Sequence, residues 1–224
     1  MNVYNISFKT PEENIAMDEE LLVRAEKHGA GEAIRFWESP VIFAVMGISG
    51  KSSNEIREKA CLKDNIPVIR RSSAGGTVLQ GPGCLNFSLV LSYKRDKALS
   101  DVNKSYAYIL GRVIECAKKA SSGPKTNRYK GFGPKAPGSA LEFRPISDIT
   151  CGDMKVSGNA QQRKRNFMLH HGTWLYDFDL ALVSKYLKEP QKRPEYRGGR
   201  KHSEFIVNVP LNIEKFKKEL VELM

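Results

Sequence analysis

The stretch that most constrains the fold of this chain runs from Arg70 to Leu91. Two adjacent arginines end an apolar run, the loop 72–76 carries little side chain, and Gly81-Pro82-Gly83 turns the chain. Apolar residues then alternate from Leu85 to Leu91, with the period of two residues that is typical of a half-buried strand. The stretch therefore predicts a strand, a bare loop, a turn and a second strand, with two guanidinium groups at the edge of the loop.

The loop has two interpretations from its residues alone. Glycine has no Cβ and tolerates positive φ, so Gly75 and Gly76 can bring N–H groups against a phosphate or carboxylate. The guanidinium groups of Arg70 and Arg71 would attract such an anion. A tight hairpin with two arginines at its edge accounts for the same residues. Composition does not choose between an anion site and a structural turn.

The length of 224 residues suits one domain with a substantial core, and we expect a single domain over residues 1–224. Hydrophobic residues make up 41% of the chain, and the longest uncharged apolar run, Val41–Ile48, is much shorter than the roughly 20 residues that span a bilayer. No basic region followed by an apolar core opens the sequence, as it would in a secretory signal. These features favour a cytoplasmic protein without a membrane segment.

Charge and cysteine content narrow the partners and the compartment. The formal net charge of +11 predicts an anionic partner without saying which kind. The cysteines show neither a CxxC pair nor a cysteine–histidine cluster, which disfavours a zinc site and favours reduced thiols. We interpret them mainly as small core residues; they are Cys61, Cys84, Cys116 and Cys151.

Helical and extended segments alternate along the chain. Thr10, Pro11 and Glu13 form a predicted helix N-terminus, and Ser52 with Glu55 forms a second capping box. Predicted helices cover residues 11–27, 52–64, 102–120 and a short stretch beyond 212, and predicted strands cover residues 3–8, 33–37, 41–46, 66–70, 85–91, 148–161 as a pair, and 167–176. Residues 121–145 are predicted to form a long irregular loop, either a linker or a substrate lid.

A second polar region follows that loop. Two predicted strands surround a Cys-Gly-Asp turn, and the second strand carries Lys155 before the small residues Gly158 and Ala160. A lone lysine on a strand is most often a solvated lysine. His170 and His171 alternate on the next strand, so only one of them can face the same side as a site. Core packing or hydrogen bonding is the ordinary role for either ring.

Two motifs in the same order resemble those of a known family. RRSSAGGTV with GCLNFSLVL, followed by KVSGNAQQR and LHHGTWLYDFDL, resemble the RRxxGGGxVxxxxGxLNxS and KxxGxAQ…HGTxL patterns of lipoate-protein ligase and octanoyltransferase catalytic domains. PEENIAMDEELL resembles their opening helix. Ala74 stands where the family usually has its first glycine, and alanine fits there only if φ is negative or the site relaxes. The resemblance implies an α+β fold with a mixed, largely antiparallel sheet and flanking helices, similar to biotin and lipoate ligase catalytic domains.

By this resemblance, the chain converts lipoate or octanoate to an acyl-adenylate with ATP and Mg²⁺, and then acylates a lysine of an acceptor lipoyl domain. Lys155 takes the catalytic role beside the acyl carboxyl group and the α-phosphate, where an ammonium group can neutralise developing charge. Asp148 becomes a candidate Mg²⁺ ligand. The implied substrate- and adenylate-binding residues are Arg70, Arg71, Ser73, Gly75, Gly76, Thr77, Asn86, Asp148, Gly158, Ala160 and His171.

Two other functions stay open. An octanoyltransferase would pass the acyl group through a cysteine thioester without ATP. Cysteine-using relatives place that nucleophile nearer Glu142, whereas Cys151 lies in the predicted turn. The other alternative is a non-catalytic basic binding module or a degenerate ligase homologue. RNA binders usually interleave aromatic residues among arginines, and only Tyr129, Phe132 and Tyr196 do so here, so a nucleic-acid partner is not expected.

Basic residues gather between Lys188 and Lys201, interrupted by prolines and glycines. This segment resembles the loop of the family in which a basic edge meets the acceptor, so we expect an acidic lipoyl-domain protein as partner. We expect a catalytic domain without the accessory C-terminal domain that many such ligases carry, and a separate accessory subunit as a partner.

Overall fold

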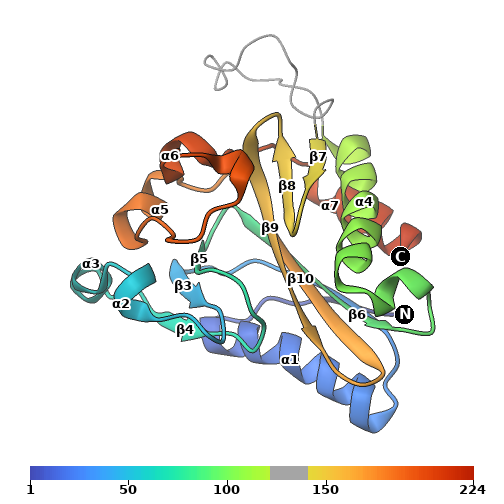
Figure 1. Ribbon diagram of the computed structural model, residues 1–224. Coiled ribbons are helices and arrows are strands. Elements are labelled where there is room, and N and C mark those ends of the chain that lie inside the picture. The colour runs from blue at the N-terminus through green and yellow to red at the C-terminus, as the bar shows by residue number, and fades with distance from the viewer. Residues whose placement is uncertain (122–140) are drawn as a thin grey trace.

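The computed structural model describes residues 1–121 and 141–224 (Figure 1). A seven-stranded sheet in the order β1-β2-β6-β10-β9-β8-β7 dominates the architecture. Its strands are β1 (Asn2–Asn5), β2 (Ala33–Trp37), β6 (Cys84–Ser92), β7 (Leu141–Arg144), β8 (Asp148–Cys151), β9 (Met154–Arg163) and β10 (Phe167–Leu175). β1 is parallel to β2, and the other neighbouring pairs are antiparallel.

A second, three-stranded sheet holds β3 (Phe43–Met46) between β4 (Val68–Arg70) and β5 (Val78–Gln80). The helices that the structure describes are α1 (Pro11–His28), α2 (Ser52–Glu55), α3 (Glu58–Lys63), α4 (Val102–Ala120), α5 (Ala181–Tyr186), α6 (His202–Phe205) and α7 (Ile213–Leu223), with 3-10 turns η1 (Lys97–Ser100) and η3 (Glu195–Arg197). The predicted α+β class with a mixed, largely antiparallel sheet is confirmed. None of these described helices is both long and apolar enough to cross a membrane.

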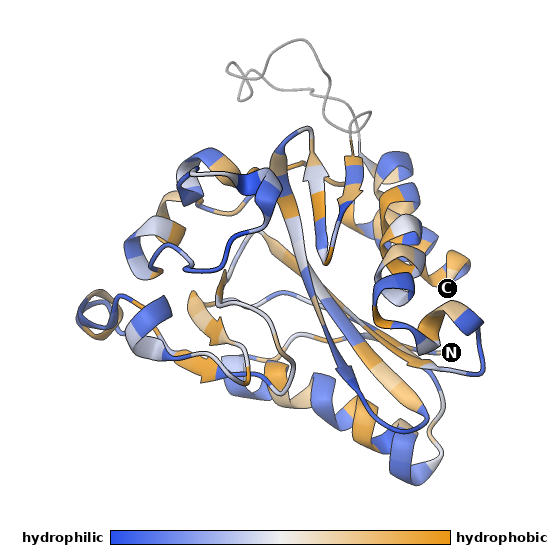
Figure 2. Ribbon diagram, in the orientation of Figure 1, coloured by the Kyte–Doolittle hydropathy of each residue, from blue (hydrophilic) through white to orange (hydrophobic). Residues whose placement is uncertain are grey.

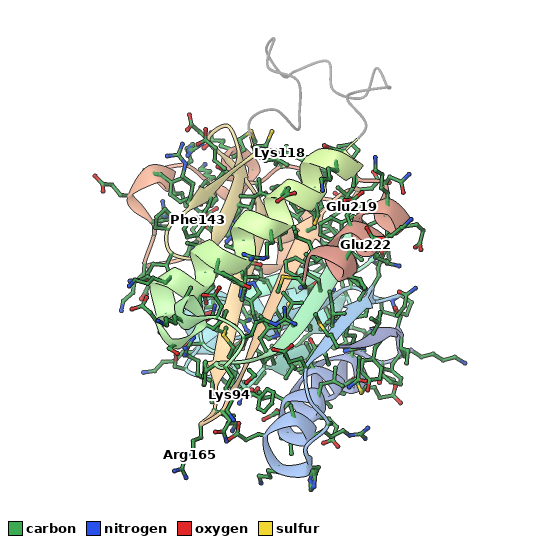
Figure 3. All side chains as sticks on the ribbon, turned by 90° about the vertical axis from the view of Figure 1, so that its right-hand side faces the viewer. Lys94, Lys118, Phe143, Arg165, Glu219 and Glu222 are labelled. Carbon is green, nitrogen blue, oxygen red and sulfur yellow. The ribbon has the colours of Figure 1, made fainter. Side chains whose placement is uncertain are left out.

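The large sheet is covered on both faces. α4 and α7 lie on one face, where Phe87, Val113 and Phe216 belong to one buried apolar cluster. Figure 3 looks onto this side and shows both helices crossing in front of the strands. On the opposite face, Leu22 of α1 packs with Val90 of β6, and α1 shows alternating hydrophilic and hydrophobic bands in Figure 2, as a helix with one buried face should. The small sheet lies on this second side (Figure 1).

Helix ends follow local chemistry where the caps are complete. The Thr10 side chain accepts a hydrogen bond from the Glu13 N–H, and the Glu13 carboxylate accepts one from the Thr10 N–H, so the predicted capping box of α1 is confirmed. Gly29 ends the helix with φ of 66°, in the left-handed region that glycine adopts without strain. Asp101 caps α4 by accepting from the Lys104 N–H.

Three predictions about local structure are wrong. Ser52 is the first residue of α2 and does not cap it, because Glu55 bonds to Thr77 instead of reaching back to the helix start. The single helix predicted over 52–64 is two short helices separated at Ile56. Part of the predicted loop 121–145 is strand β7, which pairs with β8; the rest of that prediction, residues 122–140, lies outside the described residues.

His170 lies on the apolar face of the large sheet. Its ring is buried, stacks 6.2 Å from the ring of Phe87, and has its nitrogens 3.2 and 3.3 Å from side-chain atoms of Gln161 and Asn159. Burial lowers the pKa of His170 to about 3, and the neighbouring His171 adds to the effect. Between that value and the ordinary histidine pKa of about 6.5, the unfolded chain binds a proton that the folded protein does not.

Folding stability should therefore fall as the pH is lowered through this window. At pH 5 the His170 contribution to the free energy of unfolding should be about 2 kcal/mol smaller than at neutral pH. Urea unfolding of the wild type and of His170→Gln at both pH values measures the difference. His28→Gln, at the exposed end of α1, is the matched control and should keep the wild-type pH dependence. An unchanged pH dependence in His170→Gln would contradict the assignment.

Candidate functional site

Cross-strand register brings the predicted residues together on one face of the large sheet. One row of paired residues runs Trp37, Asn86, Thr173, Gly158 and Asp148 across five strands. The next row runs Arg35, Ser88, His171 and Ala160. Directly paired residues point to the same face of a sheet. Residues from four distant parts of the sequence therefore share one surface, on the side away from α4.

Lys155 is held over this surface by its neighbours on β8 and β9. Its Nζ lies 2.7 Å from Oδ1 of Asp148, while the other carboxylate oxygen accepts a 2.5 Å hydrogen bond from the Tyr196 hydroxyl. A Cβ added to Gly158 would lie 2.8 Å from the same Nζ. Lysine, aspartate and glycine thus form one unit, because the absence of a side chain at Gly158 leaves room for the ammonium group. The Lys155 side chain remains 27% exposed.

The loop after β4 is built around the Arg71 side chain. Its guanidinium group donates to the carbonyl oxygens of Ala74 at 2.8 Å and Gly76 at 3.0 Å, and its Nε donates to Oγ of Ser73 at 2.8 Å. Burial lowers the pKa of Arg71 to about 10, which still leaves the side chain cationic at neutral pH. Arg71 therefore supports the loop from within, with its charge beneath the exposed tip at 74–76.

Arg70 points the other way, into the segment that follows β3. One of its terminal nitrogens donates at 2.9 Å to the carbonyl oxygens of Gly47, Ile48 and Gly50. The two predicted binding arginines are thus placed differently, since Arg70 orders segment 47–50 and Arg71 orders the loop. The two segments touch directly, because Ile48 N–H donates to the Ser73 carbonyl at 2.9 Å.

The loop is also tied to the sheet. Ser72 donates to Gln162 of β9 at 2.7 Å, and Oγ of Ser73 lies 2.6 Å from Nε2 of His171 on β10. A Cβ added to Gly75 would lie 3.9 Å from the Cβ of Ala160. These contacts place the loop over the row of paired residues that contains His171 and Ala160. The neighbouring row contains Gly158, over which the Lys155 ammonium group lies.

The backbone conformation of residues 74–76 shows that alanine fits at position 74. Among the described residues, Asn65 is the one non-glycine residue with positive φ, so Ala74 keeps an ordinary backbone. Gly75 carries the positive φ, 101°, that only glycine adopts readily. Within the described part of the chain, the N–H groups of Gly75 and Gly76 have no hydrogen-bond acceptor. Both residues are exposed, as is Ala74, whose N–H also has no acceptor among the described residues.

The remaining predicted residues lie around this centre. The Thr77 N–H and hydroxyl both donate to the Glu55 carboxylate of α2. Asn86 is buried and accepts a 2.7 Å hydrogen bond from Thr173, which in turn accepts one from Gln80 at 2.6 Å. Thr77 therefore marks the edge of the site beside α2, and Asn86 its floor.

The donor set does not fit a metal at Asp148. Both of its oxygens are already engaged, by the Lys155 ammonium group and the Tyr196 hydroxyl. The residues outside 122–140 contain no group of three histidine, cysteine, aspartate or glutamate side chains that could hold a metal ion. A divalent cation at Asp148 would have to displace Lys155 or Tyr196.

All four cysteines lie in apolar surroundings. Cys61, Cys84 and Cys116 are buried, and burial raises the pKa of Cys116 to about 11 and that of Cys84 still further. Cys151 ends β8 and packs against the apolar cluster under α4, on the side of the sheet opposite Lys155. Lys155 and Cys151 are therefore separated by the sheet, although they are close in sequence.

Several residues that contact the site were not among the predicted site residues. Tyr196, Gln162 and Glu55 reach it through contacts that span 48, 90 and 22 residues of sequence. Asp18 and Arg35 form a buried ion pair at 2.7 Å beneath His171. The sequence offers one indication of this ion pair. The strand Ala33–Trp37 contains an arginine, and a buried arginine needs an acidic partner.

The basic segment 188–201 is partly structural. Arg197 is 4% exposed, pairs with Glu189 at 2.6 Å and lies over the Phe205 ring. Arg200 is partly buried and donates to the Asp153 carbonyl at the start of β9. The exposed basic residues of the segment are Lys188, Lys192, Arg193 and Lys201. The structure therefore exposes the charge of these four residues, and their contact with a partner stays a prediction.

Sequence comparison supports the resemblance of the motifs. The chain is 26% identical over 185 residues to the inactive lipoate–protein ligase 2 of Plasmodium falciparum, covering 75% of this chain and 47% of that protein. It is 28% identical over 184 residues to lipoate–protein ligase 1 of Staphylococcus aureus, covering 78% and 49%. It is 27% identical over 200 residues to the octanoyltransferase LipM of Brevibacillus brevis, covering 84% and 70%. The chain thus spans about half the length of the two ligases.

Solved structures share the fold. A bi-partite lipoate protein ligase from Thermoplasma acidophilum, described with its E2 lipoyl domain, superposes with a TM-score of 0.75 at 18% identity, covering 99% of this chain and 81% of that one. A lipoate-protein ligase A bound with ATP gives 0.73 at 21% identity, covering 99% and 83%. The sequence model of the protein family described as the lipoyl protein ligase A/B catalytic domain matches residues 10–223 of this chain. The chain therefore belongs to the lipoyl protein ligase A/B catalytic domain family.

Proposed function

We propose that the chain is an ATP-dependent ligase that activates lipoate or octanoate as an acyl-adenylate and transfers it to a lysine of an acidic lipoyl domain. One observation carries the proposal. The loop carries the N–H groups of Gly75 and Gly76, and it approaches Ala160 at Gly75, where an added Cβ would lie 3.9 Å from the Ala160 Cβ. The Lys155 ammonium group lies over Gly158 on the same face of β9. Alternate residues of a strand are about 7 Å apart. The N–H groups that can bind an anion and the lysine cation therefore lie about as far apart as the ends of one phosphate ester.

Activation requires a carboxylate to approach a phosphate, which is a repulsive encounter. The acid's carboxylate oxygen attacks the α-phosphorus, a P–O bond to pyrophosphate breaks, and an acyl-adenylate forms. Lys155 supplies a positive charge between the two anions, and its bond to Asp148 fixes where that charge lies. The loop N–H groups bind phosphate oxygen, and Arg71 beneath the loop adds long-range attraction.

Transfer uses the same groups. The neutral amine of the acceptor lysine attacks the acyl carbonyl, the C–O bond to AMP breaks, and the amine loses a proton as the amide forms. Negative charge develops on the carbonyl oxygen, and Lys155 can stabilise it. Exposure of Lys155 and of loop 74–76 to solvent is consistent with an incoming macromolecular substrate.

A thioester mechanism is the second candidate, because the relatives include LipM octanoyltransferases. It makes a cysteine essential, and Cys151 faces the apolar cluster under α4. We expect Cys151→Ser to retain acid-dependent exchange of pyrophosphate into ATP within about twofold of the wild type. Exchange needs no acceptor protein, so it isolates the first step. Loss of all activity in Cys151→Ser, with an acyl thioester trapped on the wild type, would replace the ligase by the transferase.

The exposed charges of segment 188–201 should steer the acceptor domain. Reversing Lys192 and Arg193 together to glutamate should slow acylation of a lipoyl domain about tenfold at low salt and leave pyrophosphate exchange unchanged. Reversing Lys164 and Arg165, an exposed basic pair that follows the opposite end of β9, is the control with the same change of charge; Figure 3 shows Arg165 projecting from that end of the molecule. Equal slowing by both pairs would mean that net charge alone acts.

A further inference from the structure

We propose that Asp18 of α1 is a positioning residue that fixes the tautomer of His171 and, through it, the hydroxyl of Ser73 and the glycine loop. The three side chains form a chain from α1 to the loop. Oδ2 of Asp18 lies 3.8 Å from Nδ1 of His171, and Nε2 of His171 lies 2.6 Å from Oγ of Ser73. The inference rests on the proposed function only for the role of the loop.

Hydrogen-bond accounting at Ser73 selects one tautomer. Its Oγ already accepts from Nε of Arg71 at 2.8 Å, and arginine can only donate. If His171 carried its proton on Nε2, Oγ would face two donors, and its own proton would need a third partner. With the proton on Nδ1, the Ser73 hydroxyl donates to Nε2 and accepts from Arg71, so every group at Ser73 is satisfied.

The environment of Asp18 favours the same state. Burial acts to raise the pKa of Asp18, but His171 and then Arg35 act against it and hold the pKa below its usual value, so the carboxylate stays ionised. Its oxygens accept from Arg35 at 2.7 Å and from Ser88 at 2.7 Å. A carboxylate facing Nδ1 attracts the N–H of that nitrogen and repels its lone pair. Asp18 thus selects the Nδ1–H form of the ring.

The consequence reaches the exposed tip of the loop. Ser73 is 1% exposed, and Arg71, which donates to it, also donates to the Ala74 and Gly76 carbonyls. Rotation of the Ser73 hydroxyl would therefore disturb the arginine that shapes 74–76. The carboxylate on α1 orients the phosphate-binding donors without touching substrate.

Asp18→Asn should reverse the tautomer. The asparagine oxygen would take the position that accepts from Arg35, because arginine offers only donors. Its amide nitrogen would then face Nδ1 of His171 and donate to it, so the proton moves to Nε2. Ser73 would receive two donors, and the loop should lose its present arrangement. Arg35 keeps neutral acceptors from Asn14 and Ile6, which helps the variant to fold.

The test is ¹⁵N NMR of histidine-labelled protein, in which ring nitrogen shifts distinguish the N–H nitrogen from the bare one. The chain has four histidines, and His171→Asn assigns the signal. The wild type should show the Nδ1–H form of His171 without any substrate present, and Asp18→Asn should show Nε2–H. Ser88→Ala, which removes the other neutral donor to Oδ2, is the matched control and should retain Nδ1–H.

Activity provides the second readout. Asp18→Asn should raise KM for ATP on the order of tenfold in pyrophosphate exchange, more than it lowers kcat, because it acts on binding donors. An Nε2–H ring in the wild type would overturn the proposal even if no variant folds. An unchanged tautomer in folded Asp18→Asn would overturn it as well. Absence of exchange in the wild type would instead refute the ligase function and leave the NMR result standing.

Discussion

Replacing Lys155 by alanine should slow acyl-adenylate formation by a factor on the order of 10³, a loss within the range that follows removal of one donor to developing charge. The ammonium group is the only side-chain cation that the structure places over Gly158, within the residues it describes. Folding should be nearly unaffected, since the side chain is 27% exposed and contributes little to the core. Acid-dependent exchange of pyrophosphate into ATP measures the rate.

Lys164→Ala is the matched control for that substitution. Lys164 is exposed just beyond the end of β9, so the variant loses a lysine of the same strand region without approaching Gly158. It should keep the wild-type exchange rate. Exchange by Lys155→Ala within a few fold of the wild type would remove Lys155 from the reaction. The exchange rate of Asp148→Asn should lie between those of Lys155→Ala and Lys164→Ala, because this variant weakens the contact that positions Lys155 without removing the lysine charge.

Replacing Gly47 by alanine should have the second largest effect. A Cβ at this position would lie 2.1 Å from the carbonyl oxygen of Gly75, far inside contact distance, and that atom is backbone. The glycine loop must therefore move away from segment 47–50. We expect pyrophosphate exchange to fall at least tenfold and the free energy of unfolding to fall by about 1–3 kcal/mol, as in other overpacked sites.

Gly111→Ala on α4 is the control for the added methyl group. The Cβ position at Gly111 has no atom within 4 Å, and alanine favours a helix by roughly 1 kcal/mol over glycine. That variant should be as active as the wild type and slightly more stable. Normal exchange in Gly47→Ala would show that the present contact between the two loops is not required for activity.

Much of the fold could be predicted because periodicity is a local signal. The stripe over 102–120 predicted α4 within its bounds, and Thr10 with Glu13 predicted the start of α1. β7 was missed because its four residues pair with β8 after a stretch rich in glycine and proline, and pairing is not visible in composition. The predicted capping box at Ser52 is wrong for a related reason, since the Glu55 carboxylate accepts from Thr77, 22 residues away, and not from the start of the helix.

The site could be predicted only where motifs mark it. Lys155, Gly158 and the glycine loop came from the ordered motifs, and register then brought them to one face. The roles of Arg70 and Arg71 differ in a way that no spacing reveals, because each guanidinium group is oriented by carbonyl oxygens of distant turns. Tyr196 and Asp18 were missed, since a single hydrogen bond or ion pair between remote segments leaves no pattern in the sequence.

Intact mass spectrometry of an acceptor lipoyl domain tests the central claim most directly. The chain is incubated with the domain and free lipoate or octanoate, with and without ATP, and the intact mass of the domain is then measured. The account predicts that the mass rises by one acyl group only when ATP is present, that AMP appears in equal amount, and that Lys155→Ala abolishes the rise. Acylation of the domain from an acyl thioester donor without ATP, or no acylation under any of these conditions, would contradict it.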